Sequence, residues 1–237
     1  MNTGFYENLD INFTQALDMV EKDLKHEDLI ALLENGNIPE KQISALKLDN
    51  VMNQNEANIL ITNLTGCDGK IREAVALKTY EIVKNNPDKI SWFNQVKVFA
   101  DATIDINANI CRLVIDTVEI ISKNNEVFSK KYIEYLLKFI DETFIALDKI
   151  EFRDKKYVIN KQLFKLYWCL EALKIFATQI PYNTLFPILK RCSKEREYTI
   201  REKVAQIVNL FDKNLYNDII ECLKLDENYY VRHALNH

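Results

Sequence analysis

The amino-acid sequence predicts an all-α fold, namely a right-handed α-solenoid of about five to six irregular helical hairpins. Three observations predict it: a shortage of chain-breaking residues, apolar residues at helical spacing, and a helix opening that recurs along the chain. Only four glycines and four prolines occur in 237 residues, too few for the many turns of a β-sandwich or β-barrel. The composition, with 48% apolar and 28% charged residues, is typical of a globular protein with a substantial core.

The first elements are predicted from apolar spacing and turn residues. One or two short helices are expected within residues 1–36, and Gly36 stands where a helix C-terminus is expected. The apolar positions of these helices are Phe13, Leu17, Val20, Leu24, Leu29, Leu32 and Leu33. Pro39 then fits the first turn of a new helix, because a proline there loses no backbone hydrogen bond. We expect residues 1–37 to form an N-terminal helical cap and residues 38–237 to form the repeat domain.

The remaining helices are joined by short polar segments. A helix is expected over residues 70–83, after the capping residue Asp68, and Ser129 is expected to cap a long helix. The charged segment 149–156 is the least regular part of the chain and is predicted to be a long loop. The other expected helices cover residues 55–64, 90–102, 106–121, 158–177, 185–191, 199–211, 215–223 and 229–235.

One helix opening recurs down the chain. It consists of a polar capping residue, a β-branched residue three positions later, and then an arginine. The full pattern occurs at 68–72, 197–201 and 228–232, and the arginine is replaced at 107–111, 156–160 and 40–44. The β-branched anchors, at positions 43, 71, 110, 159, 200 and 231, are separated by 28, 39, 49, 41 and 31 residues. The middle spacings suit a two-helix unit of ~40–47 residues.

This pattern resembles the second helix of HEAT repeats, which belong to the armadillo-like α-solenoids. In that family an acidic residue in the turn within each repeat precedes a Val/Ile-Arg pair. The resemblance covers residues 38–237 in periodicity and is sharp at three sites. These sites are Asp68…Ile71-Arg72-Glu73-Ala74, Ile200-Arg201-Glu202 and Asp226…Val231-Arg232-His233-Ala234.

The resemblance implies a non-enzymatic scaffold that binds a protein partner through its concave face. The sequence has no Gly-rich phosphate loop, no Gly-x-Ser-x-Gly elbow and no His-Glu-x-x-His motif. Its five cysteines and three histidines give no metal-ligand spacing. The sequence therefore favours a protein without enzymatic activity, cofactor or metal, although it does not exclude an enzyme. The last expected helix carries Val231, Ala234 and Leu235, which need a cover. We expect either that the helix at 215–223 packs over them or that this end is an interaction surface, through which self-association is possible.

The expected compartment follows from the cysteines and from the hydropathy pattern. Unpaired, widely spaced cysteines are typical of reduced thiols. The N-terminus lacks a signal-peptide pattern, and no uncharged apolar run reaches the ~20 residues that span a bilayer. We therefore expect a cytoplasmic protein with no membrane partner.

Nucleic-acid binding, including DNA-base repair, is the alternative function. Residues 149–203 contain thirteen Lys and Arg residues against six Asp and Glu residues, although the net charge of the chain is −4. Basic residues bind phosphates and exposed aromatic rings stack on bases. The aromatic residues of this segment are Tyr157, Phe164, Tyr167 and Trp168, whose spacing also fits a helix core. The chain is similar in architecture to DNA glycosylases built of HEAT-like repeats, but their catalytic Asp and DNA-contacting Trp pair match no motif here. HEAT-like bilin lyases are a third comparison, which the repeat spacing does not single out.

Two groups of candidate binding residues result. The arginines of the three full helix openings form either a row of anion-binding groups or a ladder that is hydrogen-bonded to turn carboxylates and carbonyls. The repeat pattern favours the ladder. The basic segment supplies candidates for contacts with phosphate groups. The candidates are Arg72, Arg201 and Arg232 from the frame, and Lys161, Lys165, Lys194 and Arg196 from the basic segment.

Overall fold

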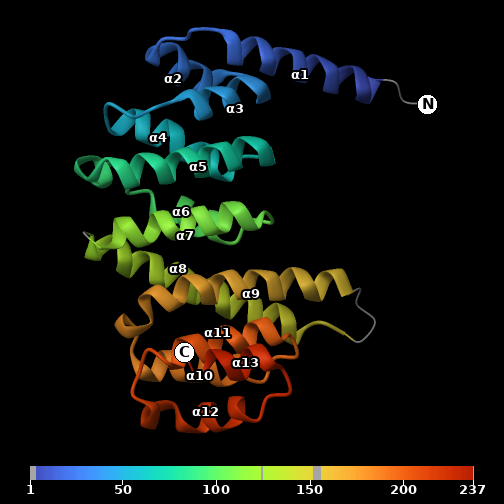
Figure 1. The fold of residues 1–237 in the computed structure, drawn as a ribbon, viewed down its shortest axis with the longest axis vertical. Coiled ribbons are helices and arrows are strands. Elements are labelled where there is room, and N and C mark those ends of the chain that lie inside the picture. The colour runs from blue at the N-terminus through green and yellow to red at the C-terminus, as the bar shows by residue number, and fades with distance from the viewer. Residues whose placement is uncertain (1–3, 124, 152–155, 237) are drawn as a thin grey trace. The chain divides into compact units, whose positions relative to one another are not determined.

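The computed structural model describes residues 4–123, 125–151 and 156–236 of the chain (Figure 1). Within these ranges every regular element is an α-helix or a short 3-10 helix, so the predicted all-α, solenoid-like fold is confirmed. The chain divides into two compact units, Met1–Phe128 and Ser129–His237. Helix α8 (Glu126–Asp148) begins at the end of the first unit and lies mostly in the second.

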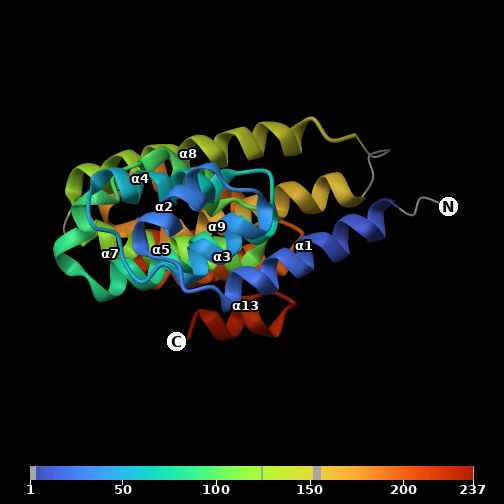
Figure 2. The same ribbon diagram turned by 90° about the horizontal axis from the view of Figure 1, so that it is seen from above.

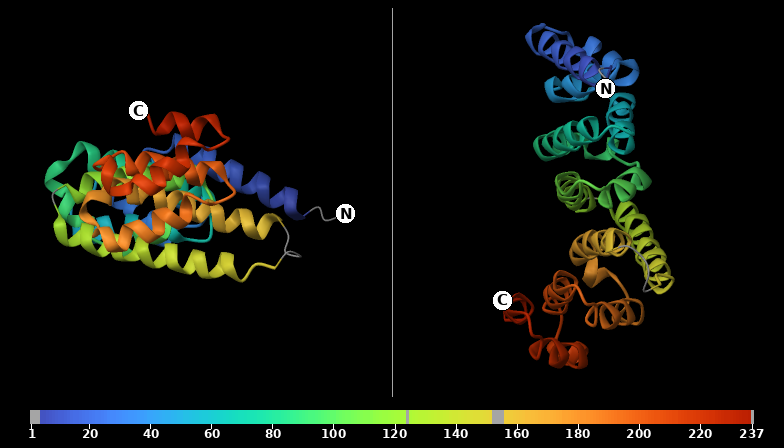
Figure 3. Two further views of the ribbon diagram at one scale, coloured as in Figure 1. Left: turned by 90° about the horizontal axis from the view of Figure 1, so that it is seen from below. Right: turned by 90° about the vertical axis from the view of Figure 1, so that its right-hand side faces the viewer.

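The first unit contains an N-terminal helix followed by three helical hairpins in chain order (Figures 1 and 3). Its elements are α1 (Gly4–Glu21), α2 (His26–Asn35), α3 (Ile38–Lys47), α4 (Gln54–Thr62), η1 (Asn63–Thr65), α5 (Gly69–Asn85), η2 (Pro87–Trp92), α6 (Val96–Thr103) and α7 (Ala108–Ser122). The hairpins pair α2 with α3, α4 with α5, and α6 with α7. The second helices α3, α5 and α7 pack side by side as one row. The predicted domain boundary between residues 37 and 38 stays a prediction.

The second unit repeats the same arrangement. After α8 its elements are α9 (Lys156–Phe176), η3 (Ala177–Gln179), α10 (Tyr182–Cys192), α11 (Tyr198–Val208), η4 (Lys213–Tyr216), α12 (Asn217–Lys224) and α13 (Tyr229–Ala234). Helix α11 packs between α9 and α13, which makes a row of second helices. In the view from above, α9 lies between α8 and α13 (Figure 2). The rings of Tyr132 on α8 and Phe176 on α9 lie 5.6 Å apart, so these two helices contact each other as well.

The β-branched anchors of the repeat pattern lie in the core at five of their six positions. Ile110, Ile200 and Val231 are fully buried, and Ile43 and Ile71 are each 8% exposed. These positions confirm the helical register of the recurring opening. The sixth anchor, Ile159, is only half-buried.

The capping residues behave as expected at three of the openings, whereas the Glu197 side chain makes no capping hydrogen bond to α11. Asp68 Oδ1 accepts from the backbone N–H groups of Lys70 and Ile71 at 2.9 and 3.1 Å. The Asn107 and Asn228 side chains cap α7 and α13 in the same way. Such caps satisfy N–H groups that have no partner inside the helix.

The prediction that Ser129 caps a helix is wrong. Helix α8 begins at Glu126, and Ser129 is only 2% exposed inside it. The side chain of Asn125 accepts from the backbone N–H of Phe128 instead, at 3.0 Å. The expected loop 149–156 is non-helical at 149–151, its residues 152–155 lie outside the described residues, and α9 begins at Lys156.

The single helix expected over residues 90–102 is interrupted. The 3-10 helix η2 ends at Trp92, and α6 begins only at Val96. Phe93, between them, is fully buried, and Gln54 on α4 donates to the free carbonyl of Trp92 at 2.5 Å. Tertiary contacts from α4 therefore compensate for the helical hydrogen bonds that this break removes.

Gly36 ends α2 for a steric reason. Its backbone is extended rather than left-handed, with φ −71°. A Cβ at this position would lie 2.4 Å from the carbonyl oxygen of Leu32 and 2.8 Å from Glu40 Cβ. Only a residue without a side chain allows this close approach of α2 and α3.

The C-terminal half of α1, whose side chains the structure describes, buries less apolar surface than its sequence suggests. Met19 is 6% exposed, whereas Phe13, Leu17 and Val20 are exposed. Among the described residues, no helix combines the length and the apolar character needed to cross a bilayer.

Candidate functional site

Arg72 ties one hairpin to the next in the first unit. Its Nε donates to Asp105 Oδ2 at 2.6 Å and its Nη2 to Asp105 Oδ1 at 3.3 Å. Its Nη1 donates to the carbonyls of Gly66 and Cys67, in the turn before its own helix, at 2.8 and 3.1 Å. The two charged side chains are 11% and 9% exposed. A buried bidentate pair of this kind fixes the register of α5 against the turn before α7.

Arg201 makes the same set of contacts in the second unit. Its Nε and Nη2 donate to Asp226 at 2.6 and 3.0 Å, and its Nη1 donates to the carbonyls of Glu195 and Arg196 at 2.6 and 3.0 Å. The hydrogen bond from Arg201 lowers the pKa of Asp226, and the same bond raises the pKa of Arg201. We call this arrangement of arginine, turn carbonyls and acid of the next hairpin a rung.

The acid occupies the same place in both rungs. In the recurring helix opening, the position after the β-branched anchor is the arginine position. It is occupied by Cys111 in the opening that follows Asp105 and by Arg232 in the opening that follows Asp226, and each acid lies six residues before it. Each acid also accepts, through Oδ1, the backbone N–H two residues further on, at 2.8 Å for Asp105 and 2.9 Å for Asp226. The carboxylate is thus oriented by its own turn toward the preceding hairpin's arginine.

Cys111 occupies the position that arginine has in the full helix openings. Its Sγ donates to the carbonyl of Asp105 at 3.1 Å, and Arg232 Nη1 donates to the equivalent carbonyl of Asp226. A thiol is too short to reach a further hairpin, so no rung starts from Cys111. Burial, together with the Asp105 carboxylate, raises the pKa of Cys111 to about 12, so the thiol is neutral and a poor nucleophile.

Glu195 is the acid at the corresponding place before the opening at 197–201, six residues before Arg201. In the two rungs, the arginine comes from the opening of the preceding hairpin. For Glu195 that opening is 156–160, whose arginine position is occupied by Asn160. None of the ion pairs formed within the described part of the chain includes Glu195. Burial raises the pKa of Glu195, although the nearby Arg191 charge lowers it in part. Glu195 is therefore an acid in a rung position that no arginine completes.

A cavity of about 510 Å³ opens beside Glu195 within the second unit. Its walls come from the end of α8, residues 150–151 that follow it, the first turns of α9, the end of α10 and the turn between α10 and α11. The apolar part of the lining is Leu147, Ile150, Ile159 and Leu163.

Arg191 also lines this cavity but is already engaged. Its Nη1 and Nη2 donate to the two carboxylate oxygens of Asp148 at 3.0 and 2.7 Å. Its guanidinium carbon lies 4.0 Å from the centroid of the Phe144 ring. This cation–π contact and the bidentate pair hold the Arg191 guanidinium against Phe144 and Asp148.

The frame arginines that the sequence singled out have their guanidinium groups engaged within the chain. Arg72 and Arg201 form the two rungs, and Arg232 donates to the carbonyl of Asp226. The ladder that the repeat pattern favours is therefore present at Arg72 and Arg201.

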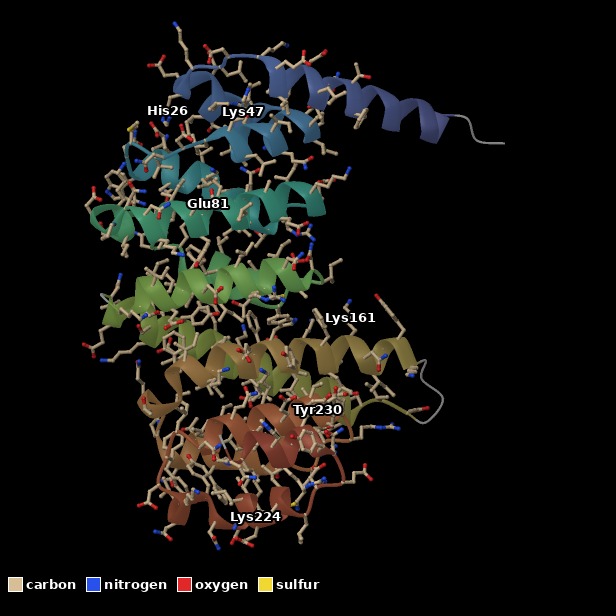
Figure 4. The ribbon with its side chains drawn as sticks, in the orientation of Figure 1. His26, Lys47, Glu81, Lys161, Lys224 and Tyr230 are labelled. Atoms are coloured by element: carbon tan, nitrogen blue, oxygen red, sulfur yellow. The ribbon has the colours of Figure 1, made fainter. Side chains whose placement is uncertain are left out.

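The four basic candidates lie on two elements. Lys161 and Lys165 lie one turn apart on α9, the first exposed and the second half-buried (Figure 4). Lys194 and Arg196 are exposed in the turn between α10 and α11. Of these four residues, Arg196 lines the cavity beside Glu195.

The aromatic residues of segment 149–203 pack mostly against one another. Trp168 is 7% exposed, and the rings of Phe164 and Tyr167 meet it edge-on at 6.1 and 5.1 Å. Lys203 lies over the Tyr167 ring at 5.0 Å and pairs with Glu171. Trp168 is therefore placed for core packing rather than for stacking on a base.

From the sequence, Asp105 is noted only as a carboxylate near the aromatic pair Trp92-Phe93, Asp226 belongs to the HEAT-like pattern, and Glu195 carries no signal of its own. The signal that finds all three is their constant position, six residues before the arginine position of each opening. Within the described residues, no group of three His, Cys, Asp or Glu side chains could hold a metal ion.

No protein-family model matches the sequence, and no curated protein matches it. Among solved structures the chain is similar to the crystal structure of an engineered protein, with 12% identity and a TM-score of 0.54, over 90% of this chain and 96% of that one. A designed armadillo repeat protein is similar with 12% identity and a TM-score of 0.45, over 90% of this chain and 97% of that one. At this level of identity the first likeness shows the fold alone. The chain is a helical repeat protein with an all-α, solenoid-like fold.

Proposed function

We propose that the chain is a non-enzymatic, HEAT-like scaffold that binds a protein partner on its row of second helices. Repeat arrays present this row on their concave face. The observation that carries the proposal is a cluster of stacked tyrosines where α11 and α13 begin, in which the two tyrosines of α13 are exposed.

Tyr229 and Tyr230 on α13 are 61% and 59% exposed. The Tyr230 ring stacks on Tyr198 of α11 with centroids 6.1 Å apart, and the Tyr229 ring lies 5.7 Å from Tyr230 and 5.4 Å from His233. Tyrosine rings expose a large apolar area that carries a polar tip, and they are enriched where proteins bind one another. Their mutual stacking holds them in place before a partner arrives, which reduces the entropy lost on binding.

Tyr229 of this cluster also borders a local hollow in the surface. A second cavity of about 510 Å³ is lined by Tyr229, Arg232 and Lys224, among others. Figure 4 labels Tyr230 on α13 and Lys224 at the end of α12. Aromatic and arginine side chains around a hollow are the usual anchors of a protein interface.

A photo-crosslinking experiment tests the proposal. The crosslinking amino acid p-benzoylphenylalanine replaces Tyr230. In the control it replaces Tyr182, an exposed tyrosine on α10, which is the first helix of its hairpin. We expect a protein to be captured at position 230 and not at 182, and the purified partner to lose binding to the double variant Tyr229→Ser, Tyr230→Ser. Capture of a second copy of the chain would identify self-association through this repeat. Equal capture at both positions, or binding that survives the double variant, contradicts the proposal.

Nucleic-acid binding ranks second. It is supported by the exposure of Lys161 and Lys194 in the basic segment. Against it, Trp168 is buried, and Arg191 and Lys203 pair with acids. The remaining free charge would give mainly contacts with phosphates.

A further inference from the structure

Among the described openings, one acid in a rung position has no arginine to pair with. Asp105 receives Arg72 of the preceding hairpin, and Asp226 receives Arg201. Glu195 lies at the same place in its turn, but Asn160 replaces the arginine that would serve it.

The space that such an arginine would occupy is open. Ile159, the anchor residue beside Asn160, is half-buried and lines the cavity in front of Glu195. The equivalent anchors Ile110 and Ile200 are fully buried. The cavity volume of about 510 Å³ lies within the range of about 300–1,000 Å³ that is usual for ligand sites.

The lining of the cavity offers an apolar wall for the stem of an arginine side chain and a carboxylate for its guanidinium group. Leu147, Ile150, Ile159 and Leu163 form an apolar wall against which the aliphatic stem of an arginine can pack. Glu195 supplies a carboxylate at the position where the fold twice binds a guanidinium fork, at 2.6 and 3.3 Å on Asp105 and at 2.6 and 3.0 Å on Asp226.

Asp148 and Arg191 of the lining already pair with each other, and Glu195 is the lining carboxylate that stands in a rung position. A guanidinium suits this site better than an ammonium, because its fork engages both carboxylate oxygens at once.

We propose that the cavity beside Glu195 binds an arginine side chain presented by a protein partner, with Glu195 in the role that Asp105 and Asp226 have in the rungs. This site rests on the proposed scaffold function, since it names the residue type that the scaffold would recognise. It lies at the start of α11, the helix that also carries Tyr198 of the stacked tyrosine cluster.

The test uses N-acetyl-L-arginine amide as the probe and the full chain labelled at its isoleucine methyl groups. In an NMR titration we expect saturable shifts of the methyl groups of Ile150 and Ile159. The lysine analogue of the probe should bind more weakly. Glu195→Gln should weaken binding of the arginine probe roughly ten-fold to hundred-fold, the usual effect of losing a charged hydrogen-bond partner.

Two further variants make the test specific. Glu197→Gln removes the same charge two residues away and should leave the affinity unchanged. Asn160→Arg should place an arginine of the chain itself in the cavity and abolish binding of the probe. Absence of saturable shifts at Ile150 and Ile159, or an affinity equal in wild type and Glu195→Gln, overturns the proposal.

The outcome is separable from that of the scaffold function. If the partner captured at Tyr230 binds Glu195→Gln as tightly as wild type, the arginine site is wrong and the scaffold stands. If the probe binds through Glu195 but no protein is captured at Tyr230, the site stands and the proposed function fails.

Discussion

Arg201 donates through Nε and Nη2 to the two carboxylate oxygens of Asp226, at 2.6 and 3.0 Å, across the boundary between two hairpins. The side chains are 11% and 7% exposed. Because Arg72 and Asp105 repeat this pair in the other compact unit, the contact is a property of the repeat rather than of one local sequence. It aligns successive second helices, and so aligns the surface that they share.

The first prediction concerns the stability of this pair. Arg201→Ala leaves Asp226 buried without its cation, and we expect the second unit to lose about 3–5 kcal/mol of unfolding free energy. Arg201→Lys should recover only part of the loss, because an ammonium cannot form the fork. Trp168 is the only tryptophan in the second unit, so urea unfolding is followed by its fluorescence in a Trp92→Phe background. The exposed Lys194→Ala is the control, and an equal effect of both substitutions would refute the role of the rung.

The second prediction concerns pH. Burial raises the pKa of Glu195 above its ordinary value of 4.5, so the folded chain holds this proton more tightly than the unfolded chain. The contribution of Glu195 to stability is therefore fully present below pH 4.5 and is lost as the pH rises through the folded pKa. Glu195→Gln should be more stable than wild type at pH 7, and the difference should vanish below pH 4.5. Urea midpoints at both pH values measure this, with Glu197→Gln as the control; a Glu195→Gln variant less stable than wild type at pH 7 contradicts it.

The third prediction concerns the anchors. Ile71→Asp, Ile200→Asp and Val231→Asp each place an unpaired carboxylate in the core, at a cost of several kcal/mol if it stays charged. We expect the first two to be worse than the third, because α13 is a helix of only six residues that opens locally at lower cost. Thermal melts of the three variants give the order. An Ile71→Asp variant that melts like wild type would show that the proposed register is wrong.

The fourth prediction addresses the alternative function. Binding to duplex or single-stranded DNA should be weak and should fall steeply with salt, because contacts from segment 149–203 would be mainly to phosphates. A mobility-shift titration at several salt concentrations measures this. Tight binding at physiological salt would reverse the ranking of the two functions, and the triple substitution of Lys161, Lys165 and Lys194 would then test whether this segment is responsible.

The sequence predicted the elements of the fold better than the contacts between them. Regular apolar spacing placed most helices within a few residues, because such spacing reports directly on the buried face. The break at Phe93 was missed, since it depends on Gln54, which is distant in the sequence and satisfies a free carbonyl from another helix. Ser129 has the chemistry of a cap but lies inside α8, where Asn125 caps instead.

The candidate site was predicted only in part for a similar reason. The arginines of the rungs were visible as a repeated Ile/Val-Arg pair, and the ladder was the favoured reading. Their acceptors are 33 residues away for Arg72 and 25 for Arg201, because the connecting segments differ in length. Glu195 could be recognised only after Asp105 and Asp226 had shown which place in the turn the acid occupies.

The most direct test of the account is a double-mutant cycle between positions 160 and 195. Asn160→Arg should complete the missing rung and raise the unfolding free energy of the second unit, followed through Trp168 in the Trp92→Phe background. In a Glu195→Gln chain the same substitution should lose that gain, with a coupling energy of about 1 kcal/mol or more. Effects that add within about 0.3–0.5 kcal/mol would show that the two positions do not meet. Glu195 would then not be the acid of a rung, and the claim that an arginine at position 160 can pair with it would be wrong.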